Sequence, residues 1–426
     1  MKKQWLLWAL LFVGLFLTAQ ANASDVQVPQ ILSVSEAIHE ALEKNPEIQI
    51  LRQRLQVFTA RAKQAPYLED PEIAIQFGGI PFSHPTALNR ADTNSIGIRQ
   101  KLPFFGKLGL KEKIAIQETR VAEQELRGKE REIVSKVKLA YADLFMAQKS
   151  IEILREQADI VRTLIRATEA RYQVGRVTQQ DVFKALLEQS ELTNQLIVAE
   201  AERGSNEVKI NALMNRPPKA AVLLPSELTV PNPVAGYTEL AELALTHRPE
   251  LKGAQEDIER TERMRELAER NRKFPDFMVG LDYWRMPTDE MAKDRYAGMV
   301  NITIPFSPWT IGKRDHEIAE TLAEKRAAKA TRDALRVMTL RELGESHAKV
   351  EAARKSVSLY QEGLLSQAEL SFRAALAAYQ AGRSEFASLL EAQRALREAR
   401  MGYFKAMVNL AQNLADLERA VGKELP

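Results

Sequence analysis

The chain has 426 residues, of which 45% are hydrophobic, and this composition is typical of a folded protein rather than a disordered one. Its 60 basic and 57 acidic residues nearly cancel and are interspersed, so they indicate solvated helix faces and exclude a basic stripe for nucleic-acid binding. It contains no cysteine, which excludes disulfides, thiolate metal sites, a cysteine nucleophile and a lipid-modified N-terminal cysteine.

Residues 1–23 have the pattern of an export signal. Two lysines follow Met1, an apolar stretch runs from Trp5 to Leu17, and Ala21-Asn22-Ala23 fits the small-x-small pattern before a cleavage site. The apolar stretch is shorter than the roughly 20 residues that a spanning helix needs, which disfavours a permanent anchor. No later window is apolar over roughly 18 residues, so a mature chain beginning near Ser24 would have to enter a membrane as a barrel.

Residues 24–214 form a first structural repeat. Ser33 with Glu36 three residues later has the pattern of a capping box that opens a helix, and Pro66 and Pro71 close that helix. Two strands are expected at about 72–80 and 95–103, and two long helices at about 107–172 and 179–214.

The first long helix has a coiled-coil period. It contains no proline and, at about 1.5 Å per residue, would be on the order of 100 Å long. Apolar or small residues recur along it in alternating steps of four and three, which is the 3.5-residue period of a coiled coil. They are Ile133, Val137, Ala140, Leu144, Ala147, Ile151, Leu154, Ala158, Val161, Ile165, Thr168 and Tyr172.

A proline-rich segment separates this repeat from a second one. Residues 215–235 contain five prolines and are expected to form a linker or equatorial segment. The second repeat covers 236–422 and is followed by a short tail, 423–426. Its strands are expected at about 276–285 and 297–305, and its long helices at about 312–379 and 385–421, the first of them with less regular heptads.

The two repeats share landmarks in the same order, and this order is the signature of a duplication. The offsets between matching landmarks are 203, 202, 206 and 207 residues, with four extra residues between the second and third landmarks of the second repeat. The landmarks are Asn45-Pro46-Glu47 with Arg248-Pro249-Glu250, Pro103-Phe104 with Pro305-Phe306, Gly106-Lys107 with Gly312-Lys313, and Tyr172 to Arg176 with Tyr379 to Arg383.

The four expected strands each have one apolar face. The apolar positions are Ile73, Ile75 and Phe77; Ile96, Ile98 and Leu102; Phe277, Val279, Leu281 and Tyr283; and Val300, Ile302 and Ile304. The alternate positions suit a wet lumen and include Gln76, Arg99, Lys101, Asp282, Asn301 and Thr303. A proline stands where each strand adjoins a helix, which marks one rim: Pro71, Pro103, Pro275 and Pro305.

Four strands cannot close a membrane barrel, because the smallest such barrels have about eight. Three chains would supply twelve strands, and a cyclic assembly would close the edges that one chain leaves open. We therefore expect a mainly α-helical fold with a small membrane β-barrel, in which a trimeric 12-stranded barrel stands on an α-helical tunnel. A pair of half-buried soluble hairpins is the alternative for these strands.

On the duplicated landmarks, the chain resembles the TolC family of outer membrane efflux proteins over essentially its whole mature length. The resemblance implies a homotrimer in the outer membrane, in contact with its lipid, with a barrel open to the outside and an α-helical tunnel that crosses the periplasm. It also implies two partners, a periplasmic adaptor protein and an inner-membrane pump of the RND type. No cofactor is expected.

The segment from Gln100 to Lys107 most resembles the heavy-metal cation branch of this family, whose members often carry a similar Pro-Phe-x-Gly-Lys junction. This implies a passive exit duct for heavy-metal cations. Many members of that branch carry a lipid-modified N-terminal cysteine, which this chain lacks, so its attachment would depend on the barrel alone. Efflux of drugs or organic toxins and type I protein secretion are alternatives within the family, and a periplasmic coiled-coil scaffold is the alternative outside it.

Two turns between long helices, Tyr172 to Asp181 and Tyr379 to Ser388, are the candidate functional site. A helix on the order of 100 Å long must reverse far from the barrel, and a glycine in each turn can adopt the left-handed conformation that ends a helix. The resemblance implies that the tunnel's gate and adaptor contacts lie there. Arginine–carboxylate pairs between neighbouring helices would narrow the mouth, whereas the alternative is solvated helix ends. The candidate residues are Tyr172, Gly175, Arg176, Asp181, Tyr379, Gly382, Arg383 and Glu385.

Four methionines gather in the third and fourth strands and their loop: Met278, Met286, Met291 and Met299. By alternation Met278 and Met299 should face the lumen, where thioethers can hold soft cations such as Cu(I) or Ag(I). The alternative is ordinary packing, which methionine suits well. No firm metal site is assigned.

An enzymatic function is not expected. The five histidines are scattered without a ligand set at helical i, i+4 spacing, and no phosphate-binding glycine loop or nucleophile elbow occurs. Asp315-His316-Glu317 is adjacent in sequence, but neighbouring residues on a helix point apart. These absences agree with a passive conduit.

Overall fold

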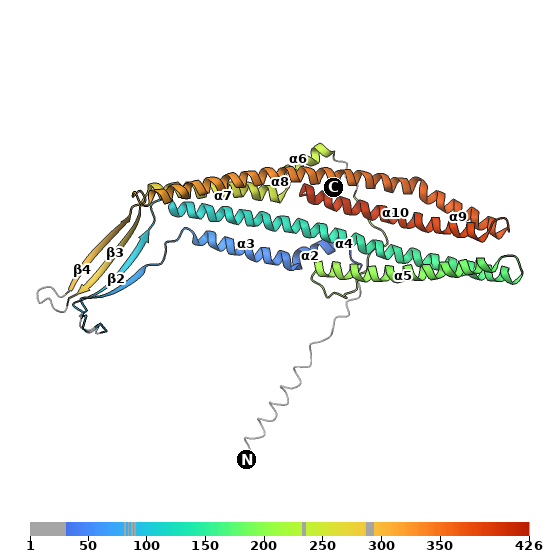
Figure 1. Ribbon diagram of the computed structural model, residues 1–426, viewed down its shortest axis with the longest axis horizontal. Helices are drawn as coiled ribbons and strands as arrows, with labels where there is room; N and C mark the ends of the chain where they lie inside the picture. The colour runs from blue at the N-terminus through green and yellow to red at the C-terminus, as the bar shows by residue number, and fades with distance from the viewer. Residues whose placement is uncertain are drawn as a thin grey trace, which may run out of the picture.

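The computed structural model describes residues 31–80, 82–83, 85–86, 88, 91–231, 236–286 and 294–425. These residues form an elongated rod with a sheet at one end and two helix–helix turns at the other (Figure 1). The expectation of a mainly α-helical chain is confirmed, and the four strands lie in one small sheet. The expected signal peptide lies outside the described residues, as do Met291, residues 232–235 of the linker and residue 426 of the tail.

Each half of the chain contributes two helices, two strands, a very long helical stretch and a return helix. In the first half these are α2 (Val34–Lys44), α3 (Pro46–Gln64), β1 (Glu72–Gly78), β2 (Thr93–Leu102), α4 (Lys107–Gln173) and α5 (Gln179–Leu213). In the second half they are α6 (Tyr237–His247), α7 (Pro249–Lys273), β3 (Asp276–Arg285), β4 (Asp294–Thr303), α8 (Ile311–Leu359), the π-helical turn η2 (Tyr360–Leu364), α9 (Leu365–Gln380) and α10 (Phe386–Val421).

The first helical segment differs from the single helix expected between Ser33 and Pro66. The capping box at Ser33 and Glu36 is present, because each residue's side chain accepts the other's backbone N–H. The helix then breaks at Asn45, whose side chain accepts the N–H of Glu47 at 2.9 Å while Pro46 occupies the first position of α3. Proline is favoured at that position, where its missing N–H costs nothing. The break therefore follows from local capping chemistry.

The four strands form one antiparallel sheet in the order β1-β2-β3-β4. Partners across an antiparallel pair share a face, so the register places the alternating apolar residues of all four strands on one side. This side is uncovered in the single chain: Ile73 is 71% exposed and Val300 is 66% exposed. The other side carries Gln76, Arg99, Lys101, Asp282, Asn301 and Thr303, as the alternation predicts.

The strand-to-helix junction around Pro103 to Lys107 has a structural role. Gly106 has a φ of 81°, which favours glycine, and it begins α4. The buried ammonium of Lys107 donates to the Asp276 carboxylate and to the Phe274 carbonyl, each at 2.9 Å. Phe104 stacks on Phe274 with ring centroids 4.4 Å apart. These contacts attach the start of α4 to the start of β3, so the motif joins the two halves of the chain.

Helix α4 lies at the centre of the rod and packs against α3, α5, α7 and α10. Ten of the twelve heptad positions predicted for it are buried; Ala158 is half-buried and Tyr172 is exposed. Burial at this period is what a coiled-coil seam requires. None of the helices described for this chain combines the length and the apolar character needed to cross a membrane.

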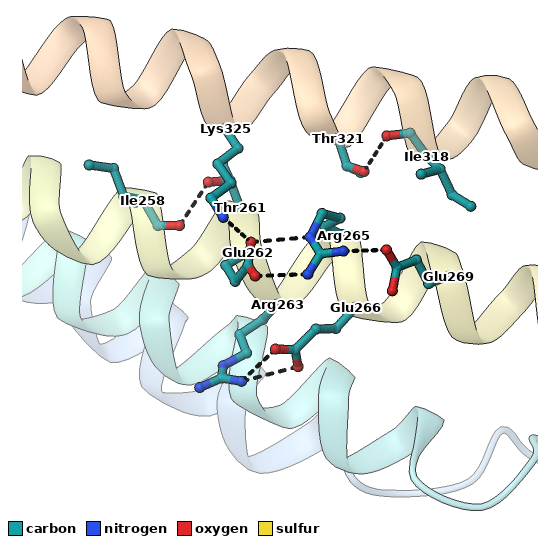
Figure 2. A network of polar contacts seen from close by, with 10 residues as sticks. All are labelled: Ile258, Thr261, Glu262, Arg263, Arg265, Glu266, Glu269, Ile318, Thr321 and Lys325. Carbon is teal, nitrogen blue, oxygen red and sulfur yellow. Dashed lines mark hydrogen bonds and ion pairs between the residues drawn. The ribbon is translucent and has the colours of Figure 1, made fainter.

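Near the sheet, α7 and α8 are joined by charged side chains (Figure 2). The Glu262 carboxylate accepts from Arg265 on its own helix at 2.9 Å and from Lys325 on α8. The hydrogen bond from Arg265, followed by that from Lys325, lowers the pKa of Glu262 from 4.5 to about 2. The Glu262–Lys325 ion pair thus links α7 to α8 midway along α7.

Candidate functional site at the helix–helix turns

The two turns named from the sequence lie together at the end of the rod opposite the sheet (Figure 1). Both have the same backbone. In the first, the Arg176 N–H donates to the Arg171 carbonyl and the Gly175 N–H to the Tyr172 carbonyl, each at 2.9 Å. In the second, Arg383 and Gly382 repeat this pattern at 2.8 and 3.1 Å.

This pair of bonds is the Schellman motif, which needs a left-handed residue at the helix end. Gly175 and Gly382 supply it with φ of 72° and 71°. Neither glycine would bring a Cβ within 4 Å of other atoms, so both are required by the backbone rather than by crowding. The duplication is therefore preserved in the turn geometry.

The side chains of the first turn serve the start of α5. Thr178 accepts the Asp181 N–H, and the Asp181 carboxylate accepts from the Thr178 N–H and hydroxyl at 3.1 and 2.9 Å. This capping box satisfies N–H groups that the first turn of a helix leaves free. Asp181 thus has a local role within the chain that the sequence reading did not assign to it.

The second turn is anchored to the first through Tyr379 and Arg171. The Arg171 guanidinium donates to the carbonyls of Tyr379 and Gln380 at 2.8 and 3.1 Å, and it lies 4.4 Å from the centre of the Tyr379 ring. These carbonyls end α9, where a cation is favoured, and stacking over an aromatic face adds attraction. The Tyr379 hydroxyl lies 3.3 Å from that of Thr168. Tyr379 is consequently only 3% exposed.

The other predicted turn residues are less engaged. Tyr172, the counterpart of Tyr379, is 45% exposed. Glu385 begins α10 without a side-chain capping hydrogen bond. Among the described residues of one chain, no ion pair joins Arg176 or Arg383 to Asp181 or Glu385. The structure brings Arg171 and Tyr379 together instead, and Arg171 was missed because an arginine at a helix end normally reads as a solvated charge.

A polar layer lies behind the turns, between the first helical pair, α4 with α5, and α10 of the second pair, which is α8 and α9 with α10. It consists of Gln157 on α4, Glu188 on α5, and Gln393, Arg394 and Arg397 on α10. Glu188 is 0% exposed and accepts from the Arg397 guanidinium at 2.7 Å and from Arg394 Nε at 2.6 Å. The hydrogen bond to Glu188 raises the pKa of Arg394. Sequence reasoning missed this layer too, because the same residue types cover the solvated faces.

The two glutamines of the polar layer are incompletely satisfied. Gln393 donates to the Gln157 Oε1 atom at 2.6 Å, while Gln157 Nε2 and Gln393 Oε1 have no partner within the described chain. A buried polar atom without a hydrogen bond costs about 1–3 kcal/mol, which wetting would recover. The polar layer therefore holds the helices by directed contacts while making their separation less costly than that of an apolar seam.

Two of the four candidate methionines lie on the polar side of the sheet. Met278 is opposite Asn301 and Met299 is opposite Gly280, so both share the side that carries Arg99 and Asp282. Arg99 and Asp282 form an ion pair at 3.7 Å. Met286 follows the end of β3, and Met291 lies outside the described residues. Within the described part of the chain, no group of three or more His, Cys, Asp or Glu side chains is arranged to hold a metal ion.

Comparison with known proteins gives a family and a fold. The sequence model of a family described as "Outer membrane efflux protein" matches residues 37–216 and 240–423, which cover both repeats. The chain is 24% identical over 285 residues to the cobalt-zinc-cadmium resistance protein CzcC of Cupriavidus metallidurans, an alignment covering 67% of this chain and 66% of that protein. The match thus spans just under two thirds of the relative's length.

Two solved structures have the same fold over nearly the whole chain. CusC, whose structures are described as showing folding and transmembrane channel formation, aligns with a TM-score of 0.77 at 16% identity, covering 95% of this chain and 96% of that chain. The outer membrane protein VceC of Vibrio cholerae aligns with a TM-score of 0.76 at 19% identity, covering 92% and 97%. At these identities the similarity establishes the fold.

Proposed function

The chain belongs to the outer membrane efflux protein family, and from this premise we propose that it is the exit duct of a tripartite efflux system. The observation that carries the proposal is the uncovered apolar side of the four-stranded sheet, placed at one end of a rod built from a 67-residue helix. Lipid is the environment that makes such a surface favourable. The rest of the chain is long enough to cross an aqueous compartment.

We infer a homotrimer from the open edges of the sheet. Strands β1 and β4 have no further neighbour in the described chain. Unpaired N–H and C=O groups within a membrane cost several kcal/mol each, so the edges must pair with other copies. Three copies give a closed 12-stranded barrel above an α-helical tunnel. Exposed apolar residues along α5, such as Phe183, Leu187 and Ile197, are suited to contacts between copies.

The helix–helix turns are the proposed gate and the contact site for a periplasmic adaptor, with an RND-type pump behind it. The supporting observation is their place at the far end of the rod, opposite the proposed barrel (Figure 1). Replacing Asp181 and Glu385 with alanine should raise single-channel conductance if these carboxylates pair with Arg176 or Arg383 of a neighbouring copy. Because Asp181 also caps α5, Thr178→Ala is the matched control, which removes the cap and keeps the charge.

The proposed cargo is heavy-metal cations, with drugs or organic toxins as the competing outcome. Two observations support metals: the similarity to the cobalt-zinc-cadmium resistance protein CzcC, and Met278 and Met299 on the polar side of the sheet. Thioethers bind soft cations such as Cu(I) and Ag(I), so Met278, Met286, Met291 and Met299 are proposed as transient contacts in the lumen. Replacing all four with leucine at equal expression should lower copper or silver tolerance, and unchanged tolerance would remove this role.

The duct itself is tested by assembly and conductance. The wild-type chain should migrate as a heat-resistant trimer in mild detergent and should form channels in a planar bilayer. A soluble, non-conducting rod would contradict the proposal and favour a coiled-coil scaffold. Deleting the gene should then reduce tolerance to cobalt, zinc or cadmium, whereas unchanged metal tolerance with increased dye sensitivity would reverse the order of the two cargoes.

A further inference from the structure

Between matching landmarks, the long helical stretch of the second repeat contains one residue more than that of the first. Lys107 and Lys313 lie near the starts of the corresponding stretches and are separated by 206 positions, whereas Tyr172 and Tyr379 lie near their ends and are separated by 207 positions. One extra residue in a continuous α-helix would rotate everything after it by about 100°. The second repeat must therefore absorb this residue somewhere between the two landmarks.

The buried residues locate the extra residue. Thr339, Leu343, Val350 and Ala353 are buried, and each lies 206 positions after a buried residue of α4: Ile133, Val137, Leu144 and Ala147. Beyond them, Phe372 and Ala375 pack into the core 207 positions after Ile165 and Thr168. The offset changes between residues 353 and 372.

The turn η2 lies within that interval. Its Leu365 N–H donates to the Tyr360 carbonyl, an i to i+5 bond that encloses one residue more than an α-helical bond does. The extra residue is taken up there, so α8 and α9 both present the same faces as the corresponding parts of α4. A π-turn also bends a helix and weakens its hydrogen-bond ladder locally.

The turn η2 packs against α10 at a glycine, Gly402. A Cβ on Gly402 would lie 2.3 Å from the Tyr360 hydroxyl oxygen and 2.7 Å from its ring carbon Cζ, so the tyrosine ring occupies the space that a side chain would fill. The neighbouring Gln361 donates to the Tyr403 hydroxyl at 3.1 Å. Figure 1 shows that the ribbon changes direction between α8 and α9. Tyr360 on Gly402 therefore marks a point where two helices can bend together.

The side-chain contacts that attach α9 and the turn end of α10 to the first helical pair lie between this point and the turns. They include the Arg171–Tyr379 contact, the polar layer around Glu188, and an apolar cluster that Phe386 and Leu389 of α10 share with residues of α4 and α5. On the other side of η2, Phe404 of α10 packs against the buried Phe145 of α4, with ring centroids 6.3 Å apart. The seam beyond η2 thus combines apolar packing with polar, partly unsatisfied contacts that water can replace, and aromatic packing of Phe404 on Phe145 lies on the other side of η2.

We propose that η2, with Tyr360 seated on Gly402, is a pivot about which α9 and the first half of α10 swing away from α4 and α5. The movement breaks the Arg171–Tyr379 contact and wets the polar layer, while the part of the rod between η2 and the sheet stays in place. This inference deepens the proposed function, because it rests on the turns being the gate of a duct.

Deletion of Gly363 tests the pivot without disturbing the packing on either side. Removing one residue from a π-turn leaves an α-helix in which α8 and α9 keep their faces. We expect the variant to form the heat-resistant trimer at wild-type level and to confer several-fold lower tolerance to cobalt ions or ethidium, whichever the wild-type chain confers. The matched control is deletion of the exposed Ala330, which shifts the register of all later residues and should abolish the trimer.

Each outcome bears on the pivot separately from the duct. If the Gly363 deletion fails to assemble as the Ala330 deletion does, η2 does not absorb the extra residue. If it assembles and transports as the wild type does, η2 is not a pivot. In both cases the proposed function stands as long as the wild-type chain conducts in a planar bilayer, and it fails if that chain does not conduct.

A second variant tests the tyrosine contact without changing chain length. Gly402→Ala forces the Tyr360 ring from its seat, so transport should fall at normal trimer level. Adding Tyr360→Ala removes the clash, and the double variant should recover part of the lost transport. Equal transport by Gly402→Ala and the wild type would contradict the role of the tyrosine contact.

Discussion

The two helical pairs of this duplicated chain have the same course but different construction. In the first pair, α4 runs for 67 residues without interruption. In the second, η2 divides the corresponding stretch into α8 and α9, which the extra residue makes necessary. This difference shows that two duplicated helical pairs need not be equivalent. One added residue converts a continuous helix into one with a defined bending point.

The two turns also differ between the repeats, in the burial of their tyrosines and in the contacts that stabilise them. Their backbones are nearly identical at Gly175 and Gly382, yet Tyr172 is exposed while Tyr379 is enclosed by Arg171 and Thr168. The first turn is stabilised by its own capping box. The second turn is stabilised by hydrogen bonds from Arg171 of α4. The first turn is therefore held by a hydrogen-bond pair of its own, whereas the second turn depends on the first helical pair for its position.

The largest effect should come from breaking the polar layer. Glu188→Ala leaves the guanidinium of Arg397 buried without its partner, and removing one member of a buried ion pair typically costs about 3–5 kcal/mol. The temperature at which the trimer dissociates in mild detergent should fall clearly. Glu200→Ala, which breaks the exposed pair with Arg155, is the control and should change little. Equal effects would mean that the polar layer does not join the two pairs.

Arg171→Ala should have the next largest effect, because it removes the anchor of the second turn. Hydrogen bonds to a charged group contribute about 1.5–3 kcal/mol in typical cases, so we expect a smaller stability loss than for Glu188→Ala. Single-channel conductance should rise as α9 is released. Arg162→Ala removes a cation from the same helix that pairs with the exposed Asp159, and it should leave conductance unchanged; an equal rise with Arg162→Ala would mean that the loss of a positive charge, rather than of the Tyr379 contact, changes the conductance.

The capping difference between the turns gives a third, smaller effect. Thr178→Ala should destabilise the start of α5 by about 1 kcal/mol, because it removes an N-cap. The corresponding position in the second repeat is Glu385, whose side chain makes no capping bond, so Glu385→Ala should not weaken α10. Hydrogen exchange of the first-turn amides measures both. Similar losses of protection in the two helices would remove this asymmetry.

The smallest effect concerns the ion pair between Glu262 of α7 and Lys325 of α8. Because the hydrogen bonds from Arg265 and then Lys325 lower the pKa of Glu262 from 4.5 to about 2, these links stabilise the fold above pH 4.5 and are lost as the pH falls towards 2. The pair is partly exposed, so the effect should be about 0–1 kcal/mol. Glu262→Gln should flatten this part of the stability–pH curve without changing conductance. A change in conductance would mean that the moving segment extends beyond η2 towards the sheet.

The sequence predicted what periodicity and turn chemistry encode. Strand alternation gave the two sides of the sheet, the heptads of α4 gave its buried seam, and the left-handed glycines follow from the duplicated turns. The turn η2 was not predicted, because an alanine-rich helix gives no local signal for one additional residue. The sequence carries two signs of this turn: the offset between the repeats changes from 206 at Lys313 to 207 at Tyr379, and the heptads of the second repeat are irregular.

The polar layer and the Arg171–Tyr379 contact were beyond sequence reasoning for another reason. Glu188, Arg394 and Arg397 belong to residue types that also cover solvated helix faces, and only the packing of α5 on α10 decides that these three meet. Asp181 was assigned from its charge to the arginine–carboxylate pairs at the tunnel mouth, although its spacing from Thr178 also fits a capping box. Local spacing was the better guide there.

If η2 is the pivot, the second helical pair moves against the first only between η2 and the turns. The chain has no cysteine, so cysteine pairs can be introduced cleanly and joined with a short, reducible bifunctional thiol reagent. Glu191→Cys with Arg394→Cys replaces an α5–α10 contact on the turn side of η2, and Asp143→Cys with Gln412→Cys replaces an α4–α10 contact on the other side. We predict that joining the first pair lowers transport and that reductant restores it, while joining the second has no effect; equal inhibition by both, or by neither, would contradict the account.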